Sequence, residues 1–317
     1  MNKFQEVPLL EVSSRREFLR HFGLVTAGLS GVASASFAAG ISSSPPELFF
    51  KISLAEWSYN RSLFGGKMTN LDFPVKARKD FDIGAIEYVN VFFKDKAKDQ
   101  PYLNDLKQRC KDNAVQSQLI MCDGEGDLGD LESSKRMQAV ENHYKWVDAA
   151  HFLGCHPIRV NCYGTGTKEE VGKAGVEGLR RLSEYAVKAG LNVLLENHDG
   201  YSSDAKWVSN IVRSVGMANC GTLPDFENFT ADNKIWEDRN EGVKELMPFA
   251  KGVSAKAINF DKDGNCVETD YARMLPIVKA SGFHGYIGIE FEGTAMSEED
   301  GIRATKKLLE RVGASLK

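Results

Sequence analysis

The chain has 317 residues, of which 42% are hydrophobic and 26% are charged, and its formal net charge at pH 7 is −4. This ordinary composition and length are typical of a globular protein with one large domain or two small ones. The acidic balance and the lack of a long basic run argue against a nucleic-acid backbone or an anionic membrane as the main partner.

The N-terminal segment has the layout of a signal peptide. Residues 13–40 read SSRREFLRHFGLVTAGLSGVASASFAAG, with a basic start, a weakly apolar stretch and then small residues typical of cleavage sites. Around Arg15 and Arg16 the segment closely resembles the twin-arginine export motif. We therefore expect residues 1–39 to be a twin-arginine-type signal peptide and residues 40–317 to be an exported, periplasmic domain. The apolar stretch is too short for a transmembrane span, so no membrane anchor is expected.

The rest of the chain repeats one pattern, in which a short apolar run is followed by a polar loop and a helical stretch. The runs that predict strands are 48–58, 83–90, 117–123, 158–164, 192–200, 220–229, 252–261 and 285–293. The helical stretches between them include 134–153, 168–190, 204–217, 268–281 and 298–314. Gly190 stands where a C-terminal helix cap is expected.

Eight strand–helix units with short connections predict an α/β fold, a single closed (β/α)₈ TIM barrel. A doubly wound open sheet is the alternative, but it would carry a Gly-rich phosphate turn after its first strand. The sequence SLAEWS at residues 53–58 is no such turn. In a barrel the carboxyl ends of the strands converge on one face, and that face carries the active site.

Polar side chains stand at the ends of the predicted strands. In VLLENHDG, residues 193–200, an apolar run meets Glu196, Asn197 and His198. A turn explains Asn, Asp and Gly by their backbone preferences, but not Glu and His. The other strands end near Glu87, Asn90, Asn161, Asp225, Lys256, Glu290 and Glu292. These residues are far apart in the sequence, yet a barrel would bring them to one mouth.

Three of these carboxylates suggest a metal site. Glu196, Asp225 and Glu290 would repel one another in a partly buried pocket unless a cation compensates their charge. An oxygen-rich site suits Mn²⁺ or Mg²⁺ and also accepts Co²⁺ or Zn²⁺. For each carboxylate alone, the alternative is a salt bridge or a helix cap.

The stretches LLENHDG, LPDFENF and YIGIEFEG resemble motifs of the sugar phosphate isomerase/epimerase family, the xylose isomerase-like TIM barrels. The resemblance covers most of residues 40–317. It implies a divalent-metal-dependent isomerase or epimerase of a sugar or keto-sugar. Glu196 and Glu290 then correspond to two metal ligands that also transfer a proton through an enediolate, and Asp225 corresponds to a third ligand.

The chain departs from that family pattern at two positions. Family members often have His-x-Lys on strand seven, where this chain has Ser254, Ala255 and Lys256. A hydroxyl is a weaker ligand than an imidazole, so either His198 completes the metal shell or a water or carboxylate does. Asn228 stands where the family pattern leads us to expect a second histidine.

The expected partner is a small, unphosphorylated sugar, and a homo-oligomer is one option for the assembly. The residues expected to contact substrate are Glu87, Asn161, Lys256, Trp57 and Asn228. Lys256 is suited to bind a substrate oxygen or to stabilise an enolate, with a salt bridge as the alternative. Trp57 is suited to stack on a sugar face, with core closure as the alternative, and a hydrogen bond to a neighbouring loop is the alternative for His198.

Two other functions use the same barrel. A keto-sugar lyase or dehydratase would employ the same carboxylates but expel a β-substituent. A non-catalytic carbohydrate-binding barrel is consistent with Ser254 in place of the usual histidine. Barrel nucleases with a zinc cluster are disfavoured, because they need several histidines and this chain has only 6.

Overall fold

Eight parallel strands form the centre of the fold in the computed structural model, which describes residues 48–231, 234–235 and 238–316. The strands are β1 (Lys51–Ala55), β2 (Ala85–Val89), β3 (Gln116–Cys122), β4 (Pro157–Val160), β5 (Asn192–Glu196), β6 (Cys220–Leu223), β9 (Val253–Ala257) and β10 (Tyr286–Phe291). They lie in the order β6-β5-β4-β3-β2-β1-β10-β9. Parallel bridges from Thr222 to Ala250 and from Asp225 to Ser254 join the two ends of this order. The predicted (β/α)₈ barrel is confirmed.

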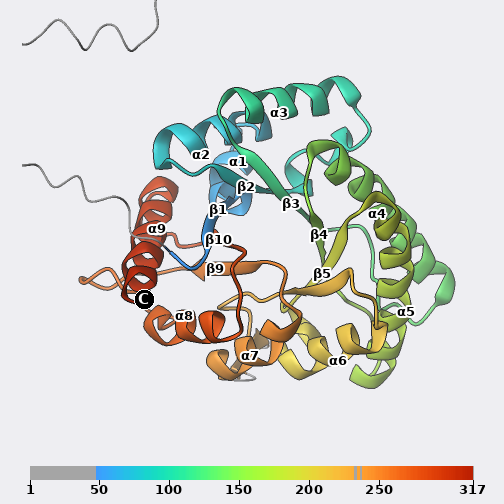
Figure 1. Ribbon diagram of the computed structural model, residues 1–317. Coiled ribbons are helices and arrows are strands. Elements are labelled where there is room, and N and C mark those ends of the chain that lie inside the picture. Colours follow the sequence, from blue (N-terminus) through green and yellow to red (C-terminus); the bar gives the residue numbers. More distant parts are fainter. Residues whose placement is uncertain (1–47, 232–233, 236–237, 317) are drawn as a thin grey trace, which may run out of the picture. The chain divides into compact units, whose positions relative to one another are not determined.

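Helices surround the strands, as Figure 1 shows. They are α1 (Asn60–Phe64), α2 (Phe73–Phe81), α3 (Gln100–Asp112), α4 (Ser133–Leu153), α5 (Lys168–Ala186), α6 (Ala205–Val215), α7 (Arg239–Leu246), α8 (Tyr271–Ala280) and α9 (Glu298–Ser315). Short 3₁₀ helices are η1 (Glu56–Tyr59), η2 (Asn70–Asp72), η3 (Asn90–Phe92), η4 (Lys94–Lys96), η5 (Val187–Ala189), η6 (Gly200–Ser203) and η7 (Met247–Phe249). An antiparallel pair, β7 (Thr230–Ala231) and β8 (Lys234–Ile235), lies outside the barrel sheet.

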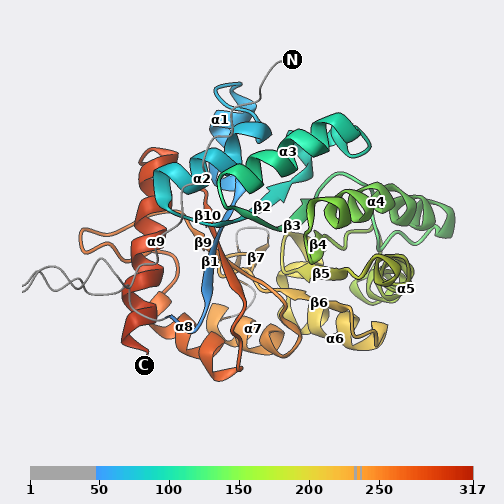
Figure 2. The same ribbon diagram turned by 45° about the horizontal axis from the view of Figure 1, so that its top comes forward.

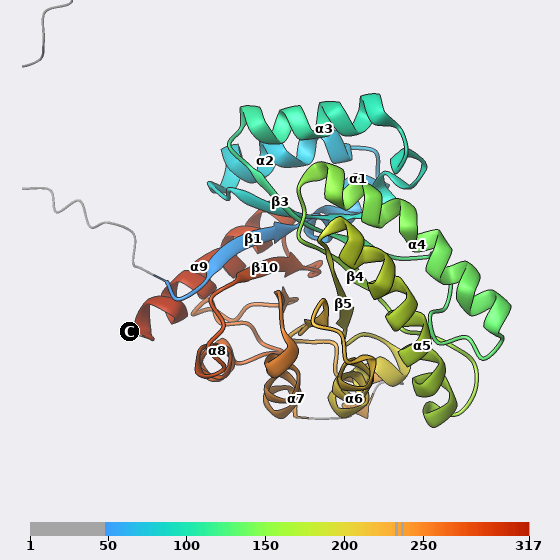
Figure 3. The ribbon, with the colours of Figure 1, turned by 45° about the vertical axis from the view of Figure 1, so that its right-hand side comes forward.

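The local sequence explains where helices begin and end. Thr167 and Glu170 form a capping box at the start of α5, and the Asp204 carboxylate accepts two backbone N–H groups at the start of α6. Gly190 ends η5 with a φ of 71°, a left-handed conformation that suits glycine, so the predicted cap is confirmed. In Figure 3, α6, α7 and α8 lie side by side along the outside of the barrel.

The apolar core has two parts. The larger one fills the space between the strands and the helices and contains Trp146, Tyr88 and Phe291. A smaller cluster lies among side chains from the other face of the strands: Ala55, Val89, Leu119, Met121, Leu194 and Leu223. Because the strands are covered on both faces, the runs contain few exposed positions and read as almost continuously apolar.

No helix in the described part of the chain is long and apolar enough to cross a membrane. The predicted signal peptide, residues 1–39, lies outside the described residues.

Candidate active site

The alternation of side chains along each strand decides which polar groups face the barrel interior. In β5, Val193 and Leu195 pack into the outer core, while Leu194 belongs to the inner cluster. Since successive side chains point to opposite faces, Glu196 follows Leu194 into the interior. The same period directs Glu87 of β2, Lys256 of β9 and Glu290 of β10 inward.

A pocket of about 460 Å³ opens at this interior face. Its walls come from strand ends and the loops that follow them: Trp57, Phe64, Val91, Asp123, Gly124, Arg159, Asn161, Tyr163, His198, Asp199, Asn228, Lys256, Glu290 and Glu292. Six of the nine predicted site residues are among them. Another hollow, of about 620 Å³, lies beside α1 and the start of α9 and is lined by no strand end.

The three remaining predicted residues, Glu87, Glu196 and Asp225, are almost fully buried and do not line the pocket wall. Each of them leaves one carboxylate oxygen without a hydrogen-bond partner among the described residues. Unpaired buried carboxylate oxygens are costly, so the charges around them determine what the site can hold.

Arg159 of β4 is the cation nearest to Glu196. Its Nε lies 3.0 Å from Glu196 Oε2, and its Nη1 donates to Asp123 Oδ1 at 2.6 Å. Burial raises the pKa of Glu196, and the guanidinium opposes that shift. Asn161 also donates to Asp123, at 2.8 Å, so the loop after β3 is tied to the end of β4.

Lys256 is the second buried cation. Its Nζ lies 3.2 Å from Glu290 Oε1, 3.1 Å from Glu292 Oε1 and 3.1 Å from Asn228 Oδ1. Its side chain is only 6% exposed. Burial nonetheless raises the pKa of Glu290 to about 8, despite the ammonium beside it. Glu290 therefore carries a proton at neutral pH more often than an ordinary glutamate.

Backbone groups hold Asp225. Its Oδ1 accepts the N–H groups of Glu227 and Asn228, both at 2.8 Å, as in an Asx turn. The Asn197 amide accepts the backbone N–H of Asp225 at 2.8 Å and donates to its carbonyl at 3.0 Å. Asn197, next to Glu196, thereby fixes the end of β6 against the end of β5.

Glu87 lies deeper, over the backbone of β10. A Cβ added to Gly288 would come within 2.8 Å of three atoms of the Glu87 carboxylate, so glycine leaves the space that this side chain fills. Ser53 donates to Glu87 Oε1 at 2.5 Å. Burial raises the pKa of Glu87 to about 7.

His198 stands on the pocket wall. Its Nδ1 lies 2.9 Å from the hydroxyl of Tyr163 and 3.4 Å from Asp199 Oδ2. Burial would lower the pKa of His198, but the carboxylates of Asp199 and Glu196 outweigh it and raise the pKa. The imidazole is therefore a candidate proton carrier as well as the predicted ligand.

Aromatic rings form one wall of the pocket. Trp57 packs against Phe64 and Phe92, with ring centroids 5.9 and 5.8 Å away, and Phe64 lies 5.1 Å from Phe92. Phe64 is 66% exposed, which is unusual for so large an apolar side chain. Such a wall suits the apolar face of a sugar ring.

The donor set of the predicted metal site does not fit a divalent ion as the side chains lie. Ligand oxygens about 2.1 Å from one ion are roughly 4.2 Å apart or less. Within the described residues, one group of at least three His, Cys, Asp or Glu residues has its ligand atoms within 4.8 Å of one another, and it consists of Glu227, Cys266 and Glu268. The predicted ligands Glu196, His198, Asp225 and Glu290 form no such group there.

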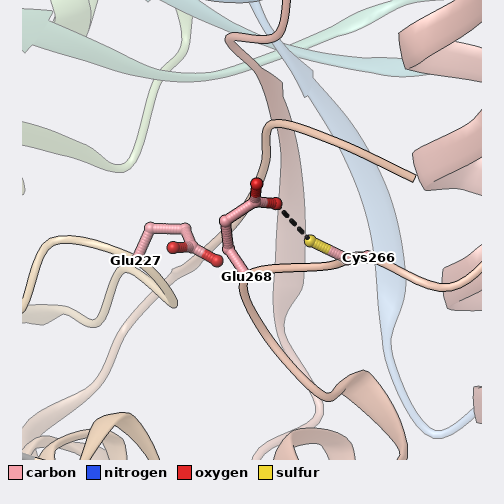
Figure 4. Close-up of side chains that lie close together, drawn as sticks. All are labelled: Glu227, Cys266 and Glu268. Carbon is pink, nitrogen blue, oxygen red and sulfur yellow. Dashed lines mark hydrogen bonds between the residues drawn. The ribbon is translucent and has the colours of Figure 1, made fainter. Parts of the chain in front are cut away.

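The Glu227–Cys266–Glu268 group, drawn in Figure 4, lies in the loops beside the barrel. Its atoms already have protein partners. Glu227 accepts from Thr269 and pairs with Arg239 Nη2 at 3.0 Å, and Glu268 accepts from the backbone and side chain of Asn259. Cys266 Sγ donates to Glu268 at 3.5 Å. These contacts tie loops together.

Several pocket residues were not predicted from the sequence. Arg159 had a signal, because a charged residue inside the apolar run of strand four must find a partner. Asp123 follows a strand directly, as the predicted residues do, whereas Glu292 was expected at the barrel mouth without an assigned role. Tyr163 stands in a loop and Phe64 ends the short helix α1, and no local pattern distinguishes them.

Comparison with known proteins supports the fold. The family model described as xylose isomerase-like TIM barrel matches residues 75–312. No curated protein matches the sequence. The IOLI protein with a bound zinc atom has 16% sequence identity and a TM-score of 0.66, over 84% of this chain and 99% of that one.

Two further solved structures are epimerases. D-allulose 3-epimerase from Methylomonas sp. shares 14% identity with a TM-score of 0.66, over 85% of this chain and 100% of that one. The 3-keto-D-glucoside 4-epimerase from E. coli shares 12% identity with a TM-score of 0.64, over 84% and 100%. At such identities these likenesses establish a common fold.

Proposed function

The chain belongs to the xylose isomerase-like TIM barrel family, and from this premise we propose that it is an enzyme that isomerises or epimerises a sugar or keto-sugar. One observation carries the proposal. At the mouth of the barrel, two buried carboxylates lie beside different cations. Glu196 faces the Arg159 guanidinium, and Glu290 faces the Lys256 ammonium. Such pairs divide acid and base roles. Two structures of this fold are epimerases of a ketose and a keto-glucoside, which supports a carbohydrate substrate.

The proposed reaction is a proton transfer on a carbon next to a carbonyl group. Glu196, opposite the Arg159 guanidinium, is the base that removes the proton. Glu290, whose pKa burial raises to about 8, carries the proton that is returned to the enediolate. A positioned acid or base of this kind contributes about 10²- to 10⁴-fold to the rate.

The pocket wall supplies the substrate contacts of the proposal. Lys256 and the amides of Asn161 and Asn228 offer donors for hydroxyl and carbonyl oxygens. Trp57 offers a face for the sugar ring. Glu87 lies beneath the wall. It affects substrate binding through its electrostatic interactions with Arg159 and Glu196.

The predicted ion, Mn²⁺ or Mg²⁺ with Co²⁺ or Zn²⁺ as alternatives, stays a prediction. A similar structure contains zinc, but no step of the proposed reaction is assigned to a metal, because the predicted ligands are not gathered around one point.

The test is solvent-deuterium exchange at the α-carbon, measured by NMR on a panel of keto-sugars. Glu196→Gln and Glu290→Gln should each fold and lose about 10²-fold or more of the exchange rate. Glu227→Gln is the matched control, because Glu227 is a buried carboxylate whose oxygens are held by Thr269 and Arg239 in the loops beside the barrel. It should keep the exchange.

His198→Gln separates the two candidate proton carriers. Full exchange in Glu196→Gln together with its loss in His198→Gln would replace Glu196 by His198 in the proposal. Loss of a β-substituent from the product would indicate the lyase. Sugar binding without any exchange would indicate the carbohydrate-binding barrel, which the Lys256–Glu290 pairing also allows.

A further inference from the structure

Two buried cations contact four of the carboxylates at the mouth of the barrel. The Lys256 ammonium contacts Glu290 and Glu292, and the Arg159 guanidinium contacts Asp123 and Glu196. Both side chains are 6% exposed and belong to barrel strands. The chain itself thus places a cation beside each of these four carboxylates.

These contacts engage Glu196 and Glu290, two of the three carboxylates that were predicted to hold a metal. Glu290 Oε1 faces Lys256 at 3.2 Å, and Glu196 Oε2 faces Arg159 at 3.0 Å. On the other side of Glu290, Ser254 stands in the predicted histidine position, with its hydroxyl 3.5 Å from Glu290 Oε2. A divalent ion among these oxygens would have to displace the ammonium or lie beside it, where the two cations repel each other.

We propose that Lys256 and Arg159 are the resident cations of this site, that the site works without a divalent metal, and that Lys256 polarises the substrate carbonyl. The last part rests on the proposed function, whereas the exclusion of the metal does not. Lys256 Nζ has its three partners at 3.1–3.2 Å and lines the pocket, so an incoming carbonyl oxygen can exchange with one of them.

The proposed step balances without a further reactant. The base takes the proton from the carbon next to the carbonyl, and the C–H electron pair forms a C=C bond. The carbonyl π electrons move to oxygen, whose developing negative charge accepts a hydrogen bond from the Lys256 ammonium. Return of a proton to carbon reverses these movements and leaves Lys256 charged as before.

The first experiment needs no turnover and therefore separates this inference from the proposed function. The protein is purified without chelators, analysed for bound metals, and titrated with Mn²⁺, Mg²⁺ or Zn²⁺ in calorimetry and thermal melts. We expect far less than one ion per chain and no rise in Tm at millimolar Mn²⁺. One tightly bound ion per chain, or a Tm that rises with Mn²⁺, would overturn the inference even if the sugar is turned over.

The second experiment removes the ammonium. Lys256→Gln leaves Glu290 and Glu292 without their cation, and we expect its affinity for Mn²⁺ to exceed that of the wild type by at least about tenfold. Lys262→Gln is the matched control, because it removes the same charge from a side chain that is 90% exposed. An unchanged Mn²⁺ affinity in folded Lys256→Gln would show that Lys256 does not exclude the ion. If that variant does not fold, the wild-type titration decides alone.

The third measurement concerns the role of Lys256 in the reaction. Where a sugar is turned over, treatment with EDTA should leave the rate unchanged, and Lys256→Gln should lower kcat by about 10²-fold or more. Loss of activity with EDTA that Mn²⁺ restores would overturn the metal-free site.

Discussion

Glu56 is a buried carboxylate outside the pocket, and its environment makes its charge expensive. It is 0% exposed, its Oε2 accepts the backbone N–H of Val89 at 3.0 Å, and its Oε1 accepts from Asn70 at 2.9 Å. Burial outweighs both hydrogen bonds and raises the pKa of Glu56 from 4.5 to about 8. Among the residues that the structure describes, no cation forms a salt bridge with Glu56, unlike Glu196 and Glu290, so the folded protein keeps Glu56 protonated near neutral pH.

This pKa predicts how stability depends on pH. The folded state holds the Glu56 proton up to about pH 8, whereas an unfolded chain loses it near 4.5. The folded state therefore binds more protons in this window, and the free energy of unfolding falls as pH rises from 4.5 to 8. The scale is roughly 1.4 kcal/mol per pKa unit, or a few kcal/mol at most.

Urea unfolding of wild type and Glu56→Gln at pH 5 and pH 9 measures this contribution. For each protein, the free energy of unfolding at pH 9 is compared with its own value at pH 5. Any pH-independent destabilisation by the glutamine amide of the variant therefore cancels. We expect the wild type to lose more stability between the two pH values than the variant. An equal loss in both proteins would show that Glu56 is ionised in the folded state throughout.

At the scale of elements, the segment after β1 builds the aromatic rim of the pocket. Figure 2 shows α1 at the carboxyl end of β1. The 3₁₀ helix η1 places Trp57 at the pocket. Helix α1 follows and packs Phe64 against the Trp57 ring. A ring that packs on its neighbours yet stays 66% exposed contributes little to the core, which leaves its face for a ligand.

Phe64→Ala should therefore weaken sugar binding without unfolding the protein. An aromatic contact of about 0.5–1.5 kcal/mol corresponds to roughly a two- to tenfold rise in KM, with kcat little changed. Val267→Ala is the control, since Val267 is 63% exposed and lies outside the pocket. Steady-state kinetics with a turned-over sugar give both constants. A KM unchanged in Phe64→Ala would mean that the sugar does not reach the rim.

At the scale of the whole molecule, the sequence predicts an N-terminal export signal before the barrel. Residues 1–39 lie outside the described residues, so the export signal is argued from the sequence alone. Arg15 and Arg16 precede a weakly apolar stretch and small residues in the arrangement of a twin-arginine signal. We propose that the barrel is exported in its folded state.

Replacement of both Arg15 and Arg16 by Lys should trap the unprocessed precursor in the cytoplasm. Lysine keeps the positive charge at both positions, so the double variant tests whether the guanidinium groups themselves are recognised. Cell fractionation and the mass of the periplasmic product give the result. Arg20→Lys is the control and should still be exported, with cleavage close to residue 39. Export of the double variant would indicate a different route.

The strand–helix units could be predicted from the sequence because they depend on local patterns. The run at 192–200 contains β5, and the stretch at 168–190 contains α5 and η5 up to Gly190. Apolar periodicity and caps act over a few residues, so they can be read without the fold. The strands are shorter than the runs because the polar ends of the runs are loops. The helices α1, α2, α3 and α7 were not named from the sequence. Three of them, α1, α2 and α7, are short, so each offers few turns over which an apolar period can be recognised.

The sequence by itself determined the barrel and the polar strand ends, including Glu196, Asp225, Lys256 and Glu290. Only the tertiary structure decided which charges meet. Carboxylates at strand ends are compatible with a metal or with salt bridges, and the pairings Arg159–Glu196 and Lys256–Glu290 join different strands across the closed sheet. Strand register and barrel closure set those distances, and both depend on packing along the whole chain, which no local pattern contains.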